Sequence, residues 1–205
     1  MSSLTQEIAH AAAQLVVEQG MEYSAAKRKA AQQLGRSASR SVELPDNAAV
    51  EEAVREYIAL FCPEEQAHEL AALRELAAQW MRRLTAFNPH LGGAVWRGTA
   101  TRHSAILLDL YCEDSKMAEI ELINMGLRFE SGERPGAKGA QAIPLIMLEL
   151  PCAALGDSVV MELSLLDHND LRGALKPDAQ GRSWRGNLQA LEALIAASQH
   201  PDARP

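Results

Sequence analysis

The fold of this protein is decided by residues 92–123, which read GGAVWRGTATRHSAILLDLYCEDSKMAEIELI. Two short aliphatic runs in this stretch, residues 93–96 and 105–111, have the composition of β-strands. A polar turn at residues 100–104 separates them, and a helical pattern follows over residues 114–124. The order of strand, turn, strand and helix predicts the beginning of a mixed α/β unit.

The rest of the rear half continues this mixed pattern. Three further aliphatic runs, at residues 127–130, 143–150 and 158–166, predict strands, and residues 188–197 predict a closing helix. Strands that alternate with occasional helices in this order are typical of a sheet with both parallel and antiparallel neighbours. We therefore expect a mixed β-sheet with helices packed on one face.

The front half shows a different pattern, because its apolar residues recur at every third or fourth position. This spacing predicts four amphipathic helices, at residues 4–19, 24–34, 47–61 and 63–87. A polar stretch broken by Pro45 separates the second helix from the third. The predicted fold class is therefore α+β, with an N-terminal helical bundle over residues 1–90 and an α/β domain over residues 91–205.

The composition is that of a globular protein, with 47% hydrophobic and 23% charged residues. The formal net charge of −7 opposes contact with nucleic acid and with anionic lipid. Residues 1–20 lack the basic segment of a secretory signal, and the longest apolar run, residues 142–148, is too short to span a bilayer. Cys62, Cys112 and Cys152 show no metal-binding or disulfide spacing. We expect a cytoplasmic protein without membrane contact, and the sequence indicates no oligomeric state.

The centre of the rear half carries a motif that is found in a known superfamily. Gly98 and Thr99 precede the short polar turn, and the strand that follows Ser104 carries Asp109. Over roughly residues 92–170, this arrangement resembles the nucleotidyltransferase superfamily related to DNA polymerase β. Its members have a strand, a Gly-Ser or Gly-Thr pair, a polar loop or short helix, and a strand with two alternating carboxylates.

The resemblance implies a role for each matching residue. Gly98 would let the backbone approach a triphosphate closely, and Thr99, like the nearby Ser104, would offer a hydroxyl to it. Carboxylates two positions apart on a strand point the same way, so they can hold two Mg²⁺ ions for an in-line displacement. The superfamily's cofactor, Mg²⁺, is therefore the one that the resemblance implies here.

The sequence departs from the superfamily at the carboxylates. Ala105 and Leu107 stand at the two positions that the pattern assigns to acidic residues, and only Asp109 lies on the same side of the strand. Asp109 would be the metal ligand, and Glu162 would supply a further catalytic carboxylate from a later strand. One carboxylate on the strand does not neutralise two divalent ions and a triphosphate. The resemblance implies a nucleotide-binding protein with largely lost catalytic carboxylates, and nucleotidyl transfer as its activity if catalysis is retained.

A second candidate site precedes the closing helix and reads DLRGALKPDAQGRSWRG. Arg172 and Arg185 carry guanidinium groups that suit phosphate, and the glycines bring backbone N–H groups close to an anion. Together with Arg102 and His103 of the polar turn, they would form one wall of a pocket for a nucleotide or phosphate-bearing small molecule. The alternative is a solvated surface loop anchored by Trp184.

Residues 27–40 suggest a rival function, because they carry five basic residues and no acidic one. The spacing from Ala31 to Ser37 matches the turn of a helix-turn-helix motif, which would make the chain a DNA-binding regulator. Against this, a recognition helix from Ser37 would meet Pro45 after about two turns, and the net negative charge opposes DNA. A third interpretation is an interaction protein without a small ligand.

Overall fold

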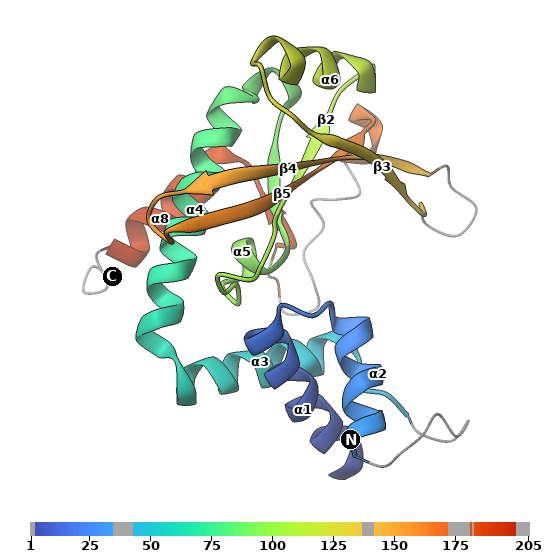
Figure 1. Ribbon diagram of the computed structural model, residues 1–205, viewed down its shortest axis with the longest axis vertical. Coiled ribbons are helices and arrows are strands. Elements are labelled where there is room, and N and C mark those ends of the chain that lie inside the picture. The colour runs from blue at the N-terminus through green and yellow to red at the C-terminus, as the bar shows by residue number, and fades with distance from the viewer. Residues whose placement is uncertain (1–2, 35–42, 137–141, 172–180, 182, 200–205) are drawn as a thin grey trace. The chain divides into compact units, whose positions relative to one another are not determined.

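Figure 1 shows the computed structural model of the chain, which describes residues 3–34, 43–136, 142–171, 181 and 183–199. The chain divides into two compact units. The first comprises residues 1–69 and 99–103, and the second comprises residues 70–98 and 104–205. The helix α4 (Pro63–Arg83) therefore begins in the first unit and ends in the second.

The first unit is helical. Its helices are α1 (Ser3–Gln19), α2 (Tyr23–Gln33), α3 (Asn47–Phe61) and the beginning of α4. The Asp46 side chain caps α3 by accepting a hydrogen bond from the Ala49 N–H at 2.7 Å. α1 packs against α2 and α3, and small alanine side chains let these helices approach closely. The fully buried residues of this core include Ile8, Ala12, Ala13, Ala26, Ala30, Val50 and Val54.

The fourth helix ends earlier than the sequence predicted. α4 ends at Arg83, and a separate 3₁₀ turn, η1 (Thr85–Phe87), follows it. Asn88 then takes a left-handed conformation with φ 47°, and the following Pro89 disfavours the α-helical conformation at that position. Phe87 is apolar because its side chain is buried, although the residue lies outside α4. The apolar repeat therefore continues past the end of the helix.

The described residues of the second unit form a six-stranded mixed sheet in the order β3-β4-β5-β2-β1-β6. β2 and β5 pair in parallel, and the other neighbouring strands are antiparallel. The further elements are α5 (Gly93–Arg97), α6 (Ser115–Asn124), η2 (His168–Asp170) and α8 (Leu188–Gln199). The strands are β1 (His90–Gly92), β2 (Ile106–Tyr111), β3 (Glu130–Arg134), β4 (Ile143–Cys152), β5 (Asp157–Leu166) and β6 (Arg185–Gly186).

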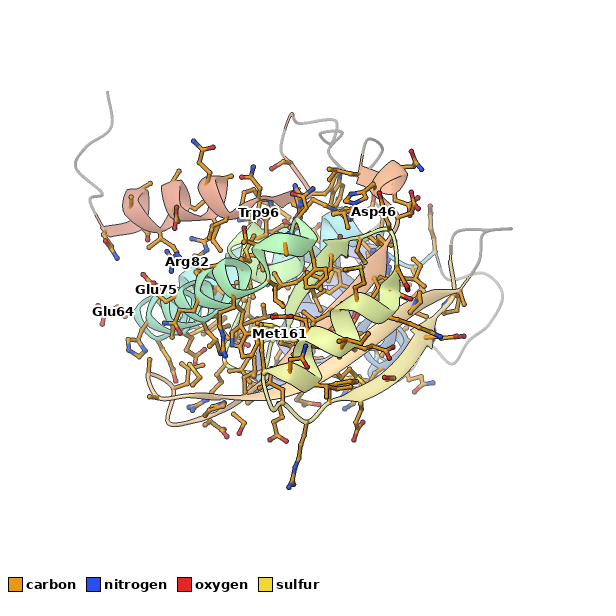
Figure 2. The ribbon with its side chains drawn as sticks, turned by 90° about the horizontal axis from the view of Figure 1, so that it is seen from above. Asp46, Glu64, Glu75, Arg82, Trp96 and Met161 are labelled. Atoms are coloured by element: carbon orange, nitrogen blue, oxygen red, sulfur yellow. The ribbon has the colours of Figure 1, made fainter. Side chains whose placement is uncertain are left out.

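The two faces of this sheet differ in polarity. One face is buried, and Figure 2 shows the helix α4 running over it, with Met161 on the side of β5 that faces the helix. On the opposite face, which we call the open face, Met147 and Val160 are exposed and Asp109 and Glu162 are partly exposed. The alternation of side chains along β2, β4 and β5 produces this division, except at the buried residues Tyr111 and Ser164. The buried face includes Ile106, Leu108, Leu110, Ile146, Leu148, Met161 and Leu163.

The predicted α+β class is confirmed, with helices in the front half and a mixed sheet with helices on one face in the rear half. The helices expected in the front half and the closing helix are present, and so are the strands β2, β4 and β5. Within the described ranges, no helix combines the length and the apolar character that crossing a membrane requires.

Two predicted strands are wrong in position. Residues 93–96 belong to the short helix α5, because Gly93 takes φ 64° and turns the chain out of β1. The strand expected at residues 127–130 begins only at Glu130, since Gly126 ends α6 with φ 73° and a connecting segment follows it. The true strand reads ESGER and has no apolar alternation by which to recognise it.

Candidate functional site

Asp109 and Glu162 lie on neighbouring parallel strands of the open face. Asp109 of β2 pairs in register with Ser164 of β5, and Glu162 of β5 pairs with Leu107 of β2. The two acidic residues are therefore diagonal neighbours, with about 8 Å between their Cα atoms from the spacing and rise of strands. Their side chains point to the same side of the sheet, because alternate residues of a strand share a face.

Leu107 stands where the superfamily pattern places a carboxylate. Its position in the sheet is directly beside Glu162 on β5 and opposite Gly92 on β1. The Leu107 side chain packs against Gly93, where an added Cβ would lie only 2.9 Å from Leu107 Cδ1. The position of β2 nearest to Glu162 is thus filled by an apolar contact, not by a metal ligand.

Arg185 of β6 forms an ion pair with Asp109. Arg185 pairs in register with Gly92 of β1, and its guanidinium reaches past this strand to Asp109 of β2. Its Nη1 donates to the Asp109 carboxylate and also to Tyr111 Oη, at 3.2 Å from the latter. The Asp109 side chain is only 12% exposed and that of Arg185 26% exposed, so water screens this pair weakly.

Tyr111 and His90 complete the cluster around Asp109. Tyr111 is fully buried, and its ring meets the His90 ring edge-on, with 5.3 Å between the centroids. His90 is oriented by a hydrogen bond from Nδ1 to the Asn88 carbonyl oxygen, at 2.9 Å. Burial raises the pKa of Tyr111 and Asp109 adds to the rise, while the hydrogen bond and charge of Arg185 oppose it. The Tyr111 phenol is therefore protonated at neutral pH.

These residues do not fit a Mg²⁺ site. Mg²⁺ requires hard oxygen ligands in nearly octahedral geometry, and a two-metal centre requires several carboxylates. Across the described residues, no three His, Cys, Asp or Glu side chains are grouped so that they could hold a metal ion. The Asp109 carboxylate already contacts a cation, the Arg185 guanidinium. The geometry therefore gives no support to the metal-binding role expected for Asp109.

Gly98 and Thr99 lie at the end of a helix, whereas the sequence pattern placed them at the end of a strand. Gly98 takes φ 83° and closes the last turn of α5, a common use of glycine at a helix C-terminus. The glycines at the strand end are Gly92 and Gly93, where β1 passes into the short helix α5. Thr99 Oγ1 is buried and has no hydrogen-bond partner among the described residues.

The polar turn that follows is bonded into the first unit. Gln66 Nε2 donates a hydrogen bond to the Ala100 carbonyl at 2.8 Å, and both groups are buried. The backbone N–H of Arg102 donates to Glu69 Oε2 at 2.9 Å, and Arg102 Nε lies 3.8 Å from Glu69 Oε1. These contacts give the turn a structural role, because they satisfy backbone groups that would otherwise be buried without partners.

His103 also packs within the first unit. An added Cβ at Gly20, at the end of α1, would lie 2.8 Å from His103 Cβ, so only glycine fits there. Arg172, the remaining arginine of the predicted pocket, lies outside the described residues. The predicted site residues are divided between the units. Thr99, Arg102 and His103, all predicted to bind the ligand, lie in the first unit, and the second contains the ligand-binding candidates Gly98, Ser104 and Arg185 with the catalytic candidates Asp109 and Glu162.

The basic segment of the rival DNA-binding interpretation is described only in part. Residues 35–42, which include the expected start of the recognition helix, lie outside the described residues. Lys27 Nζ donates a hydrogen bond to Asn47 Oδ1 at 2.9 Å, and Lys29 Nζ donates to Gln19 Oε1 at 3.0 Å. These two lysines of α2 therefore bond to the first residue of α3 and to the last residue of α1.

Sequence reasoning missed Tyr111 and His90. Tyr111 lies two positions after Asp109, so strand alternation alone places it on the same face, and this indication was available. His90 could not be found in this way, because the first strand of the pair was expected at residues 93–96 and not at β1.

No protein-family model matches the chain, and no curated protein matches it. The chain is similar to a structure of Cid1 poly(U) polymerase with MgGTP bound, at 18% identity, over 50% of this chain and 33% of that chain, with a TM-score of 0.34. It is similar to Cid1 in complex with the UTP analogue UMPNPP, at 20% identity, 57% and 38% coverage and a TM-score of 0.36. It is also similar to a cytoplasmic RNA terminal U-transferase, at 21% identity, over 47% of this chain and 27% of that chain, with a TM-score of 0.28. The chain spans about a third of the length of these proteins.

Proposed function

We propose that this chain is a nucleotidyltransferase-like protein that binds a nucleotide or another phosphate-bearing small molecule on the open face of the sheet, without metal-dependent transfer. The observation that carries the proposal is the guanidinium of Arg185, which Asp109 and Tyr111 hold over this face. The succession of β1, α5 and β2, with Glu162 on the adjacent strand β5, supports the superfamily.

Arg185 can bind an anion while it stays paired with Asp109. A guanidinium has five N–H donors in a rigid fork, and the contacts to Asp109 and Tyr111 both use Nη1. Its Nε is buried and has no hydrogen-bond partner in the part of the chain that the structure describes. The Arg185 side chain is 26% exposed, so a phosphate oxygen approaches the guanidinium from its exposed side, and the fixed orientation lowers the entropic cost of binding.

The proposed role is binding and not transfer, because of the residue types on β2. Leu107 removes the carboxylate that would lie beside Glu162, and Asp109 is neutralised by an arginine. Transfer by two metal ions needs carboxylates that are free to coordinate them.

Isothermal calorimetry with the full chain tests the proposal. ATP and UTP are titrated in buffer with Mg²⁺ and in buffer with EDTA, and we expect weak binding of equal strength in both. Arg185→Ala should weaken it about tenfold or more, the effect of losing a charge-assisted hydrogen bond. Arg128→Ala is the control, because Arg128 is an exposed arginine of the same unit.

Each other outcome contradicts a part of the proposal. Binding that appears only with Mg²⁺ would mean that a metal site forms after all. If neither nucleotide binds, or if Arg185→Ala and Arg128→Ala behave alike, the open face is not the ligand site. Titration with a DNA duplex tests the rival function, DNA binding. We expect no binding at physiological salt, because the net charge of the chain is −7.

A further inference from the structure

The helix α6 of the second unit has an uncovered apolar face. α6 follows β2 and buries Ala118 and Leu122. Its other large apolar side chains point away from that core, since Met117, Ile120 and Ile123 are 58%, 56% and 60% exposed. These three residues are spaced by three positions and therefore form one stripe along the helix. A helix with apolar residues on both sides is typical of one that is covered on both sides.

A pocket of about 490 Å³ adjoins this stripe. Met117 and Ile120 of α6 form one wall, and Ala86, Phe87 and Cys112 contribute further apolar surface. In Figure 1 the C-terminal end of α4 lies beside α6, and η1 follows from it. The charged residues that line the pocket are Arg83, Glu113, Glu121 and His168. Stripe and pocket together make a groove with an apolar floor and charged edges.

We propose that this groove binds an amphipathic helix of a partner protein, with basic residues along the edges of its apolar face. The acidic residues of the groove determine the charge of the partner. Glu113 and Asp114 precede α6, and Glu119 and Glu121 lie on it. Arg83, the basic residue of the pocket, has its guanidinium over the Trp80 ring, 4.5 Å from the centroid.

The state of Cys112 agrees with an acidic groove. Burial raises the pKa of this thiol, and Asp114 and Asp167 raise it further by their negative charge. The thiol is therefore protonated at neutral pH. An apolar floor with acidic edges is the arrangement that helix-in-groove recognition uses for basic amphipathic targets.

A second copy of this chain is a poorer occupant than a basic helix. If two α6 helices paired antiparallel about Ile120, Met117 of one copy would meet Ile123 of the other. Glu119 of one copy would then lie opposite Glu121 of the other, and such like-charge pairs are destabilising. A helix with lysine or arginine at these positions would cover the same stripe and pair with both glutamates.

The test uses a fluorescein-labelled amphipathic helical peptide of leucine and lysine, with a second peptide that has glutamate for lysine. Fluorescence anisotropy with the full chain should show binding of the lysine peptide only. Ile120→Asp should weaken it about tenfold or more, as loss of a central apolar contact does. Leu60→Asp is the matched control, because Leu60 is a 76% exposed helical residue of the first unit and the charge change is the same.

Four results would overturn the proposal. They are failure of the lysine peptide to bind, equal binding of the glutamate peptide, equal weakening by the two variants, and a dimer in light scattering that Ile120→Asp dissociates. The last result would assign the groove to a second copy. Met117→Glu replaces Ile120→Asp if the latter lowers the melting temperature.

Discussion

Residues 100–103 of the polar turn and the strand β2 are close in sequence, yet their polar groups have different uses. In the turn, the Ala100 carbonyl and the Arg102 N–H are bonded by side chains of the first unit. On β2, the backbone is satisfied by neighbouring strands, and Asp109 is left to pair with a distant arginine. A buried turn needs its polar groups for its own backbone, whereas a strand leaves alternate side chains available for a site.

The two carboxylate–arginine contacts show the same difference. The Glu69 carboxylate lies 2.9 Å from the Arg102 backbone nitrogen but 3.8 Å from Arg102 Nε, and the Arg102 side chain is exposed. Asp109 contacts the Arg185 guanidinium directly, and both side chains are mostly shielded from water. The first contact fixes a loop, and the second joins the side chains of two strands of the sheet.

The largest expected effect concerns the boundary between the units. We proposed a boundary near residue 90, but the buried residues Leu73, Trp80 and Met81 of α4 fall in the second unit. A fragment of residues 88–205 lacks them, so we expect it to aggregate and to lose cooperative thermal unfolding. A fragment of residues 63–205, which keeps α4, is the control and should stay soluble. If 88–205 unfolds as cooperatively as the whole chain, the boundary near residue 90 is supported.

A smaller effect separates the two carboxylate–arginine contacts. Asp109→Ala leaves the shielded charge of Arg185 without its partner, and we expect it to lower the free energy of unfolding by about 2 kcal/mol. Glu69→Ala should cost about 1 kcal/mol, because it removes one hydrogen bond to the Arg102 backbone and an ion pair that solvent screens. Urea denaturation measures both, with Glu149→Ala as the exposed control on the open face. Equal costs for Asp109→Ala and Glu69→Ala would remove the distinction.

The smallest expected effect is a pH dependence in the first unit. Tyr57 Oη donates to Glu18 Oε1 at 2.6 Å, and this contact raises the pKa of Tyr57 to about 12 from its ordinary 10.0. The folded state therefore holds the phenolic proton more tightly than the unfolded chain. This stabilisation is complete below pH 10 and is lost as the pH rises from 10 to 12.

Tyr57→Phe tests this dependence. The variant should lose less stability than the wild type between pH 10 and pH 12, and the difference should be small because solvent screens the pair. Tyr111→Phe provides the comparison in the second unit, where burial is the main cause of the raised pKa. Identical pH profiles of wild type and Tyr57→Phe would show that the hydrogen bond to Glu18 is not kept in solution.

The helices were predictable because their apolar period and their capping residues are local. Asp46 and Asp114 cap α3 and α6, and each stands directly before the helix that it caps. The aliphatic run at residues 93–96 was ambiguous for the same reason, since a short apolar run suits a strand or a buried helix turn. Its outcome depended on the left-handed Gly93, which the sequence pattern did not specify.

The sequence by itself determined the α+β class, the periodic helices, the strands β2, β4 and β5, and the face that Asp109 occupies. Local spacing is sufficient for each of these, because the periods of 3.6 and 2 are properties of a single segment. Only the tertiary structure decided that Arg185 reaches past Gly92 to Asp109, 76 residues away, and that the polar turn belongs to the helical unit. Such contacts follow from strand order and from which buried backbone groups need partners, and no periodicity along the chain encodes either.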